Sequence, residues 1–186
     1  MNIENYIKKY RNQDLTGDQI ESVIGSPPVL YTDLKNYNSI FDLLPKSAPY
    51  RIILIQVSSI TSGHYVALWL NYASNTIYYF DSYGYGIDKP ITLGLAKYDT
   101  ANHVELYLTK LVNASGCKVW FNIVDYQSKR DVRISTCGRW SSTAIRLRNL
   151  FPKEFPLLFK GNVNKYLNEP DNVITLLTLL DFKSLV

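Results

Sequence analysis

The sequence feature that most constrains the fold is the run of residues 50–57, Tyr-Arg-Ile-Ile-Leu-Ile-Gln-Val. This run is almost continuous in apolar and β-branched residues, which is typical of a strand buried on both faces. Other elements must therefore cover both faces of the sheet that contains it. With 186 residues, the chain is long enough for one domain with a sizeable core and short for two, so we expect a single domain over residues 1–186.

Three further strands and several helices are predicted around this run. Residues 65–70 and 76–80 flank a turn and predict a hairpin, and residues 118–124 predict a fourth strand. Thr16-Gly17-Asp18-Gln19 has the form of a capping box, so a short helix follows it and ends near Gly25. Strands in the middle of the chain, with helices before and after them, predict an α+β domain. Apolar residues recur at helical spacing in five segments, and we expect a helix in each. The segments are marked by Ile3, Tyr6, Ile7 and Tyr10; Ile20, Val23 and Ile24; Val104, Tyr107, Leu108 and Leu111; Trp140, Ala144, Leu147 and Leu150; and Val173, Leu176, Leu177 and Leu180.

Composition excludes several classes of protein. A hydrophobic content of 46% and a charged content of 19% are those of an ordinary soluble globular protein. No stretch approaches the roughly 18–20 apolar residues of a membrane span, and the first residues do not resemble a signal peptide, so we expect no membrane association. The net charge of +4 is mild, and no block of basic residues stands out. Metal-ligand spacing and a glycine-rich phosphate loop are both missing, so we expect neither a metal nor a cofactor.

Cys137 stands at the predicted start of the helix marked by Trp140 and Ala144. A thiol at this position meets the positive end of the helix dipole and free backbone N–H groups, which favour the thiolate. Cys137 is therefore a candidate nucleophile. The alternative is a small buried residue at a helix start. Only Cys117 accompanies it, so there is no disulfide framework, which fits a reducing compartment.

Three polar residues are predicted at strand ends. His64 opens the second strand and Asp81 closes the third, so the hairpin brings the imidazole and the carboxylate within hydrogen-bond reach. Gln127 closes the predicted fourth strand, upstream of Cys137. Taken singly, they have ordinary alternatives as a loop histidine, a turn aspartate and a surface glutamine. His103, on a predicted helix, is the weaker candidate for a base.

Together these four residues supply the groups that thiol acyl transfer needs. His64 close to Cys137 forms a thiolate–imidazolium pair, and Asp81 on the far ring nitrogen fixes the tautomer. The amide of Gln127 and the backbone N–H of Cys137 can hold the developing oxyanion. Losing one such donor raises the barrier by about 3–4 kcal/mol.

The order of these residues resembles that of the adenain/Ulp1-like cysteine proteases, which include the adenovirus maturation protease and the SUMO-deconjugating enzymes. The resemblance runs from about Tyr50 to Leu150. Its matching segments are Gly63-His64-Tyr65-Val66-Ala67-Leu68-Trp69, Tyr79-Phe80-Asp81-Ser82-Tyr83-Gly84, Gln127 and Cys137-Gly138.

The resemblance implies a papain-like core in circularly rearranged order, in which the cysteine lies on a central helix and the histidine and aspartate on the facing sheet. The small chain with its lean N-terminal region looks closer to viral maturation enzymes, including those of virophages, than to the larger deconjugating domains. The resemblance implies a protease domain that cleaves viral capsid or core precursors, often near small residues such as glycine. It also implies a location in the virion and in the cytoplasm of the infected host.

The chain departs from the family at several positions. Tyr65 stands where tryptophan usually follows the histidine, Thr136 stands where aspartate is common, and the spacing from Gln127 to Cys137 is longer than usual. Adenovirus-type enzymes are stimulated by DNA and by a peptide joined through a second cysteine. Cys117 lies in a comparable region, so an activating peptide or DNA is a possible partner, although a core thiol is the alternative for Cys117.

Two other functions stay open at the level of the sequence. A deubiquitinating or deSUMOylating isopeptidase would share the mechanism and differ in the substrate groove. A catalytically silent, capsid-associated binding protein would keep the fold without the chemistry. The presence of His64, Asp81 and Cys137 together argues against this silent protein, because a lapsed site is free to lose any of them.

Overall fold

A five-stranded mixed sheet lies at the centre of the protein. The computed structural model describes residues 3–59, 62–98, 105–128, 135–159 and 169–182. The strand order is β1-β2-β3-β4-β5; the two outer pairs are parallel and the two inner pairs antiparallel. The strands are β1 (Val29–Leu30), β2 (Tyr50–Ser59), β3 (Ser62–Asn71), β4 (Thr76–Phe80) and β5 (Lys118–Phe121).

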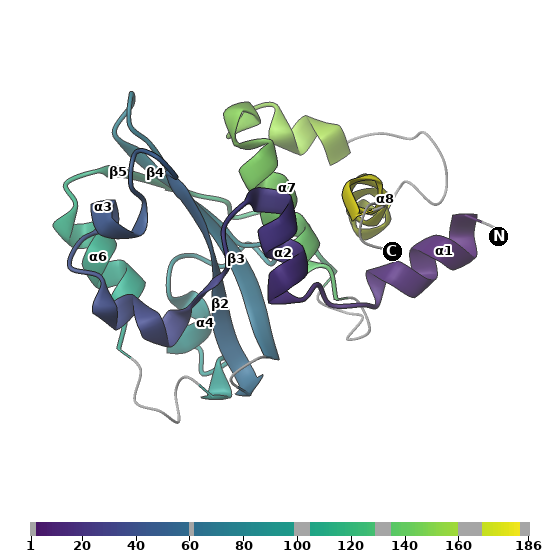
Figure 1. Ribbon diagram of the computed structural model, residues 1–186, viewed down its shortest axis with the longest axis horizontal. Helices are drawn as coiled ribbons and strands as arrows, with labels where there is room; N and C mark the ends of the chain where they lie inside the picture. Colours follow the sequence, from purple (N-terminus) through teal and green to yellow (C-terminus); the bar gives the residue numbers. More distant parts are fainter. Residues whose placement is uncertain (1–2, 60–61, 99–104, 129–134, 160–168, 183–186) are drawn as a thin grey trace.

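Helices cover both faces of this sheet, as Figure 1 shows. On one side lie α2 and α7, with α1 and α8 beyond them; on the other lie α3 and α6. This arrangement is the α+β fold, with a central mixed sheet flanked by helices, that the sequence predicted. The α-helices are α1 (Ile3–Arg11), α2 (Gly17–Ile24), α3 (Ile40–Leu43), α4 (Lys89–Thr92), α6 (Tyr107–Ala114), α7 (Cys137–Arg146) and α8 (Pro170–Phe182), and the 3-10 helices are η1 (Tyr31–Asn36), η2 (Arg148–Leu150) and η3 (Phe155–Phe159).

Strand β2 is buried on both faces, which confirms the expectation from its apolar run. Ile52 and Leu54 pack in the core beneath α7, whereas Ile53 and Ile55 pack in the core beneath η1 and α6. Successive side chains of a strand point to opposite faces, so one continuous apolar run serves both cores.

Most predicted boundaries agree with the structure, and the exceptions are the fourth strand and the helix of Cys137, which ends at Arg146 so that Leu150 lies in η2. Strand β4 and the capping box of α2 are as predicted, and Gly25 ends α2 in the left-handed conformation at φ 74°. Strand β5, however, ends at Phe121 instead of residue 124. The reason is Asn122, whose side-chain amide bonds both the N–H and the C=O of Asp81 and takes the place of the next ladder bonds.

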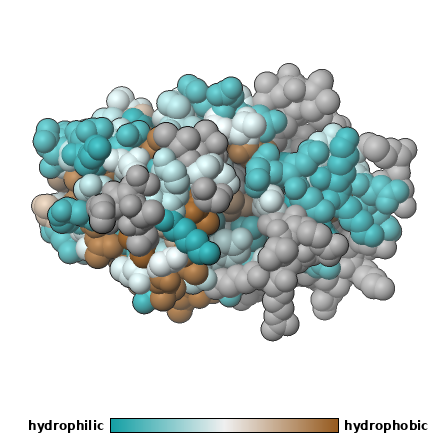
Figure 2. Space-filling view, turned by 90° about the horizontal axis from the view of Figure 1, so that it is seen from below, coloured by the Kyte–Doolittle hydropathy of each residue, from teal (hydrophilic) through white to brown (hydrophobic). Residues whose placement is uncertain are grey.

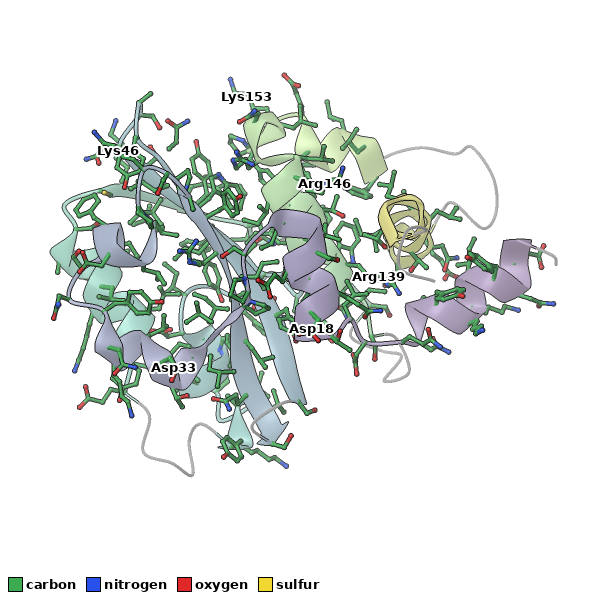
Figure 3. All side chains as sticks on the ribbon, in the orientation of Figure 1. Asp18, Asp33, Lys46, Arg139, Arg146 and Lys153 are labelled. Carbon is green, nitrogen blue, oxygen red and sulfur yellow. The ribbon has the colours of Figure 1, made fainter. Side chains whose placement is uncertain are left out.

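Helix α7 is buried on every side, although the sequence indicated only one apolar face. Its residues from Cys137 to Ile145 are all buried, because the sheet covers one side and α2 and α8 cover the rest. Figure 3 shows Arg139 on the side of α7 nearest to α1 and α8, while Asp33, Lys46 and Lys153 lie at the periphery. Arg139 donates to the hydroxyl of Thr178 (3.0 Å) and to a carbonyl oxygen of α1 (3.1 Å).

Apolar side chains on the surface gather on one half of the molecule. On the face that Figure 2 shows, the hydrophobic residues lie mostly on the half that contains the sheet, with hydrophilic residues around them. Some of the exposed apolar side chains follow the edge strand β5, where Ile123 is 78% exposed and Val124 is 52% exposed. Within the segments that the structure describes, no helix has both the length and the apolar content needed to cross a membrane.

Candidate active site

Cys137 is the first residue of α7, so its thiol lies at the N-terminal end of a buried helix. The backbone N–H groups of a first helical turn have no acceptor within the helix and point outward with the positive end of the dipole. Gly138 allows this end to pack closely, because a Cβ at residue 138 would lie 3.2 Å from Leu15 and 3.3 Å from the ring of Tyr65. Close packing therefore explains why a glycine follows Cys137 in the sequence.

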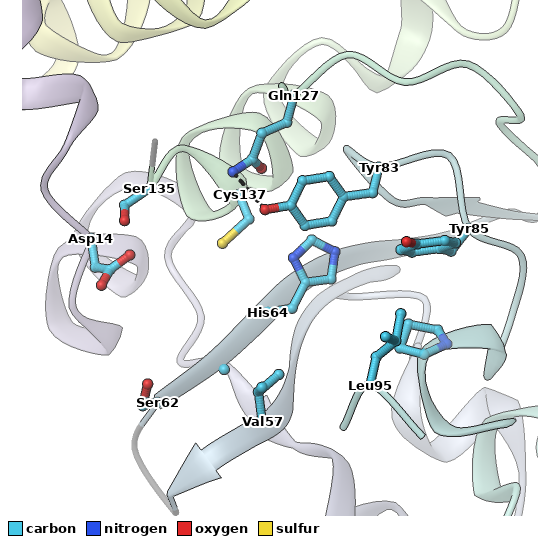
Figure 4. A pocket seen from close by; sticks show the side chains of 12 residues that line it. Asp14, Val57, Ser62, His64, Tyr83, Tyr85, Leu95, Gln127, Ser135 and Cys137 are labelled. Atoms are coloured by element: carbon cyan, nitrogen blue, oxygen red, sulfur yellow. Dashed lines mark hydrogen bonds between the residues drawn. The ribbon is translucent and has the colours of Figure 1, made fainter. Parts of the chain in front are cut away.

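His64 lies near the start of β3, and its ring joins Asp81 at the end of β4. Nε2 of His64 is 2.9 Å from Oδ1 of Asp81, which is fully buried. The hydrogen bond that the hairpin predicted is thus present. The other ring nitrogen faces the sulfur of Cys137 (Figure 4). His64 itself lies within β3 opposite Ile55, instead of at the first residue of the strand.

The electrostatic surroundings of His64 favour the imidazolium. Burial disfavours the charged ring, but the charge and the hydrogen bond of Asp81, together with Cys137, outweigh burial and raise the pKa of His64 from 6.5 to about 10. A protonated ring at neutral pH is the partner that a thiolate needs.

Gly63 brings β3 close to β2 immediately before His64. A Cβ at residue 63 would lie only 2.0 Å from the carbonyl oxygen of Ile55, so no side chain fits there. The close approach of the two strands therefore requires glycine at residue 63, and it fixes the position from which His64 enters the site.

Asp81 is fixed by its neighbours as well as by His64. Its Oδ1 also accepts the N–H of Tyr83 (2.7 Å), and the side chain of Asn122 holds its backbone. His64 and the turn at Tyr83 thus hold one oxygen of the carboxylate, and Asn122 fixes the backbone that carries it.

Gln127 lies in a loop, and the expectation that it closes a strand is wrong, because β5 ends at Phe121. Its Oε1 accepts the hydroxyl of Ser82 (2.8 Å), and its Nε2 donates to the hydroxyl of Tyr83 (3.1 Å). Its backbone N–H also donates to the carbonyl of Ser82 (2.9 Å). The amide is therefore oriented by the two residues that follow Asp81.

These side chains meet in one open pocket of about 340 Å³, shown in Figure 4. His64, Gln127 and Cys137 line it from three different elements, and Tyr83 and Tyr85 form part of its wall. The structure thus gathers Cys137, His64 and Gln127 at one pocket, with Asp81 behind the histidine. Predicted residues outside this group are His103, which lies outside the described residues, and Cys117, a free and half-buried cysteine just before β5 whose thiol lies 3.1 Å from Oδ1 of Asn75.

Comparison with known proteins places the chain in a viral family. No protein-family model matches the sequence. It is 30% identical over 153 residues to the uncharacterized protein V9 of Sputnik virophage, a match that covers 81% of this chain and 85% of V9. The chain belongs to the V9 family. Among solved structures, the ASFV pS273R protease matches with a TM-score of 0.36 and 18% identity over 68% of this chain, which spans 42% of the length of that protease.

A further buried carboxylate, which no motif in the sequence marked, holds two segments of this V9-family site. Asp171, near the start of α8, is 3% exposed. One of its oxygens accepts the hydroxyl of Thr136 and the indole N–H of Trp140 (3.0 Å), and the other accepts the N–H of Ser128 (2.8 Å). Asp171 therefore ties the start of α7 to the segment just after Gln127.

The bond between Thr136 and Asp171 concerns one of the positions at which the chain departs from the family it resembles. The adenain/Ulp1-like enzymes that the sequence resembles commonly have aspartate directly before the cysteine, where this chain has Thr136. In the V9-family structure its hydroxyl bonds Asp171, so a carboxylate reaches the start of α7 from another helix. Ser82 and Tyr83 were visible in the Asp-Ser-Tyr-Gly motif only as turn residues. No sequence signal pointed to Asn122 or Asp171.

Proposed function

We propose that this V9-family protein is a cysteine endopeptidase whose catalytic groups are Cys137, His64, Asp81 and Gln127. The observation that carries the proposal is the joint geometry at one pocket: a cysteine at a helix N-terminus faces a histidine whose far nitrogen is 2.9 Å from a buried aspartate. The raised pKa of His64 supports the same assignment, because it keeps the imidazolium at neutral pH.

In this mechanism the sulfur of Cys137 attacks the carbonyl carbon of the scissile peptide bond. A C–S bond forms, and the electron pair of the C=O bond moves to oxygen, where the N–H of Cys137 and the amide of Gln127 stabilise the negative charge. When this intermediate collapses, the C–N bond breaks and His64 gives its proton to the leaving amine. Water then attacks the thioester, passes a proton to His64 and releases the thiolate and the carboxylic acid.

As substrates we propose precursor proteins of a viral capsid or core. The support is the kinship with a virophage protein over most of that protein's length and the resemblance of the His64, Asp81, Gln127 and Cys137 motifs to viral maturation enzymes. On this proposal the protein acts in the virion and in the cytoplasm of the infected host. Stimulation by a peptide or by DNA remains part of the same hypothesis.

The first experiment compares alkylation of the two cysteines by iodoacetamide across pH, read by mass spectrometry. Cys117 is the internal control. We expect Cys137 to react fast well below the free-thiol pKa of about 8.5 and to lose this advantage in His64→Ala. Slow and equal labelling of both cysteines would contradict an assembled site and favour the silent binding protein.

A second experiment looks for substrates without assuming a sequence. Folded proteins from virions and from host extract are incubated with the wild type or with Cys137→Ala, and new N-termini are identified by mass spectrometry. Cleavage of capsid or core proteins in the wild type only supports the maturation role. Release of ubiquitin or SUMO from conjugates instead would favour the isopeptidase.

A further inference from the structure

Tyr83 occupies a position in the pocket that its role as a turn residue does not explain. Its ring stacks on the imidazole of His64, with centroids 4.8 Å apart and planes 25° apart. In Figure 4 its hydroxyl points towards the amide of Gln127 and the sulfur of Cys137. The stack and the backbone contacts of the turn hold the ring, so the hydroxyl has a fixed place beside the nucleophile.

The hydroxyl proton of Tyr83 is available to a substrate, because the hydrogen bond from Gln127 does not use it. Nε2 of Gln127 donates to the Tyr83 oxygen, so that contact uses a lone pair and not the proton. Among the residues that the structure describes, none accepts a hydrogen bond from this hydroxyl. Burial and the nearby charge of Cys137 raise the pKa of Tyr83, which keeps the phenol protonated.

We propose that the hydroxyl of Tyr83 is a third oxyanion donor, beside the N–H of Cys137 and the amide of Gln127. When the sulfur bonds the carbonyl carbon, the electron pair that moves to oxygen is stabilised by this O–H, and the phenol keeps its proton throughout. Gln127 positions this hydroxyl, because one hydrogen of its amide bonds the Tyr83 oxygen. The inference rests on the proposed function and adds a catalytic residue to it.

The test compares two reactions of the same thiol that need no knowledge of the natural substrate. Acylation by p-nitrophenyl acetate passes through an oxyanion, whereas alkylation by iodoacetamide does not. Both are measured in the full chain carrying Cys117→Ser, so that Cys137 is the reacting cysteine. Cys137→Ala gives the background.

We expect Tyr83→Phe to slow acylation about tenfold or more and to leave the alkylation rate unchanged. Phenylalanine preserves the stack on His64, so unchanged alkylation also shows that the site is still folded. The matched control is Tyr78→Phe, which removes a phenol hydroxyl from β4 outside the pocket and should change neither rate.

Two outcomes would overturn the inference. Equal acylation rates in the wild type and Tyr83→Phe would show that the hydroxyl does not contact the oxyanion. An equal fall in the acylation and alkylation rates of Tyr83→Phe would show that the hydroxyl stabilises the thiolate of Cys137 and not the oxyanion. The proposed function fails separately, because its failure appears as slow alkylation of Cys137 in the wild type.

Discussion

Removing the carboxylate of Asp171 should destabilise the protein more than any exposed charge does. Asp171→Ala removes the acceptor of three donors: the buried hydroxyl of Thr136, the buried indole N–H of Trp140 and the half-buried backbone N–H of Ser128. A hydrogen bond to a charged group contributes about 1.5–3 kcal/mol, and the three share one carboxylate, so their losses do not simply add. We expect a loss of about 3–5 kcal/mol in the free energy of unfolding, because each buried donor left without an acceptor costs about 1–3 kcal/mol and two of the three are buried.

The measurement is urea unfolding followed by tryptophan fluorescence. Glu169→Ala is the matched control, because Glu169 lies two residues away and pairs with Arg11 while its side chain is 62% exposed. An exposed pair contributes at most about 1 kcal/mol. Asp171→Asn keeps one carbonyl acceptor and should fall between the two variants.

Asp171 should also affect the chemistry, because it connects the start of α7 to the segment that carries Gln127. In Asp171→Asn we expect acylation of Cys137 by p-nitrophenyl acetate to fall more than its alkylation by iodoacetamide. The reasoning would be refuted if Asp171→Ala cost no more stability than Glu169→Ala, or if Asp171→Asn changed both rates equally.

Three further predictions concern the residues around the histidine. Because the pKa of His64 is raised to about 10, its contribution to stability is full below pH 6.5 and is lost as pH rises through about 10; urea unfolding at several pH values should show this loss, and His64→Ala should remove it. Gly63→Ala should lower both the melting temperature and the alkylation rate of Cys137, because its Cβ meets the Ile55 carbonyl; a wild-type alkylation rate would contradict this. Asn122→Ala leaves the buried N–H of Asp81 without an acceptor, whereas the Asp81 carbonyl keeps its bond from the N–H of Gly84, so we expect about 1–3 kcal/mol of destabilisation by urea unfolding, and wild-type stability would be inconsistent with the contact.

The sequence by itself predicted β2, the hairpin of β3 and β4, the start of β5 and the start of the helix that carries Cys137, but not β1. These features follow from local patterns: alternating or continuous apolar runs, a turn between two strands, and apolar residues at helical spacing. The hairpin was enough to predict the contact between His64 and Asp81, since antiparallel pairing fixes which residues of adjacent strands are neighbours.

Only the tertiary structure decided how the rest of the site is held. The bond from Ser82 to Gln127 joins residues 45 positions apart, and the bond from Ser128 to Asp171 joins residues 43 positions apart. No period or motif encodes such contacts, because they depend on how a loop and a distant helix pack against the sheet. For the same reason the sequence placed Gln127 at a strand end that does not exist. Local patterns define the elements, whereas the orientation of the oxyanion donors depends on side chains that meet only when the chain is folded.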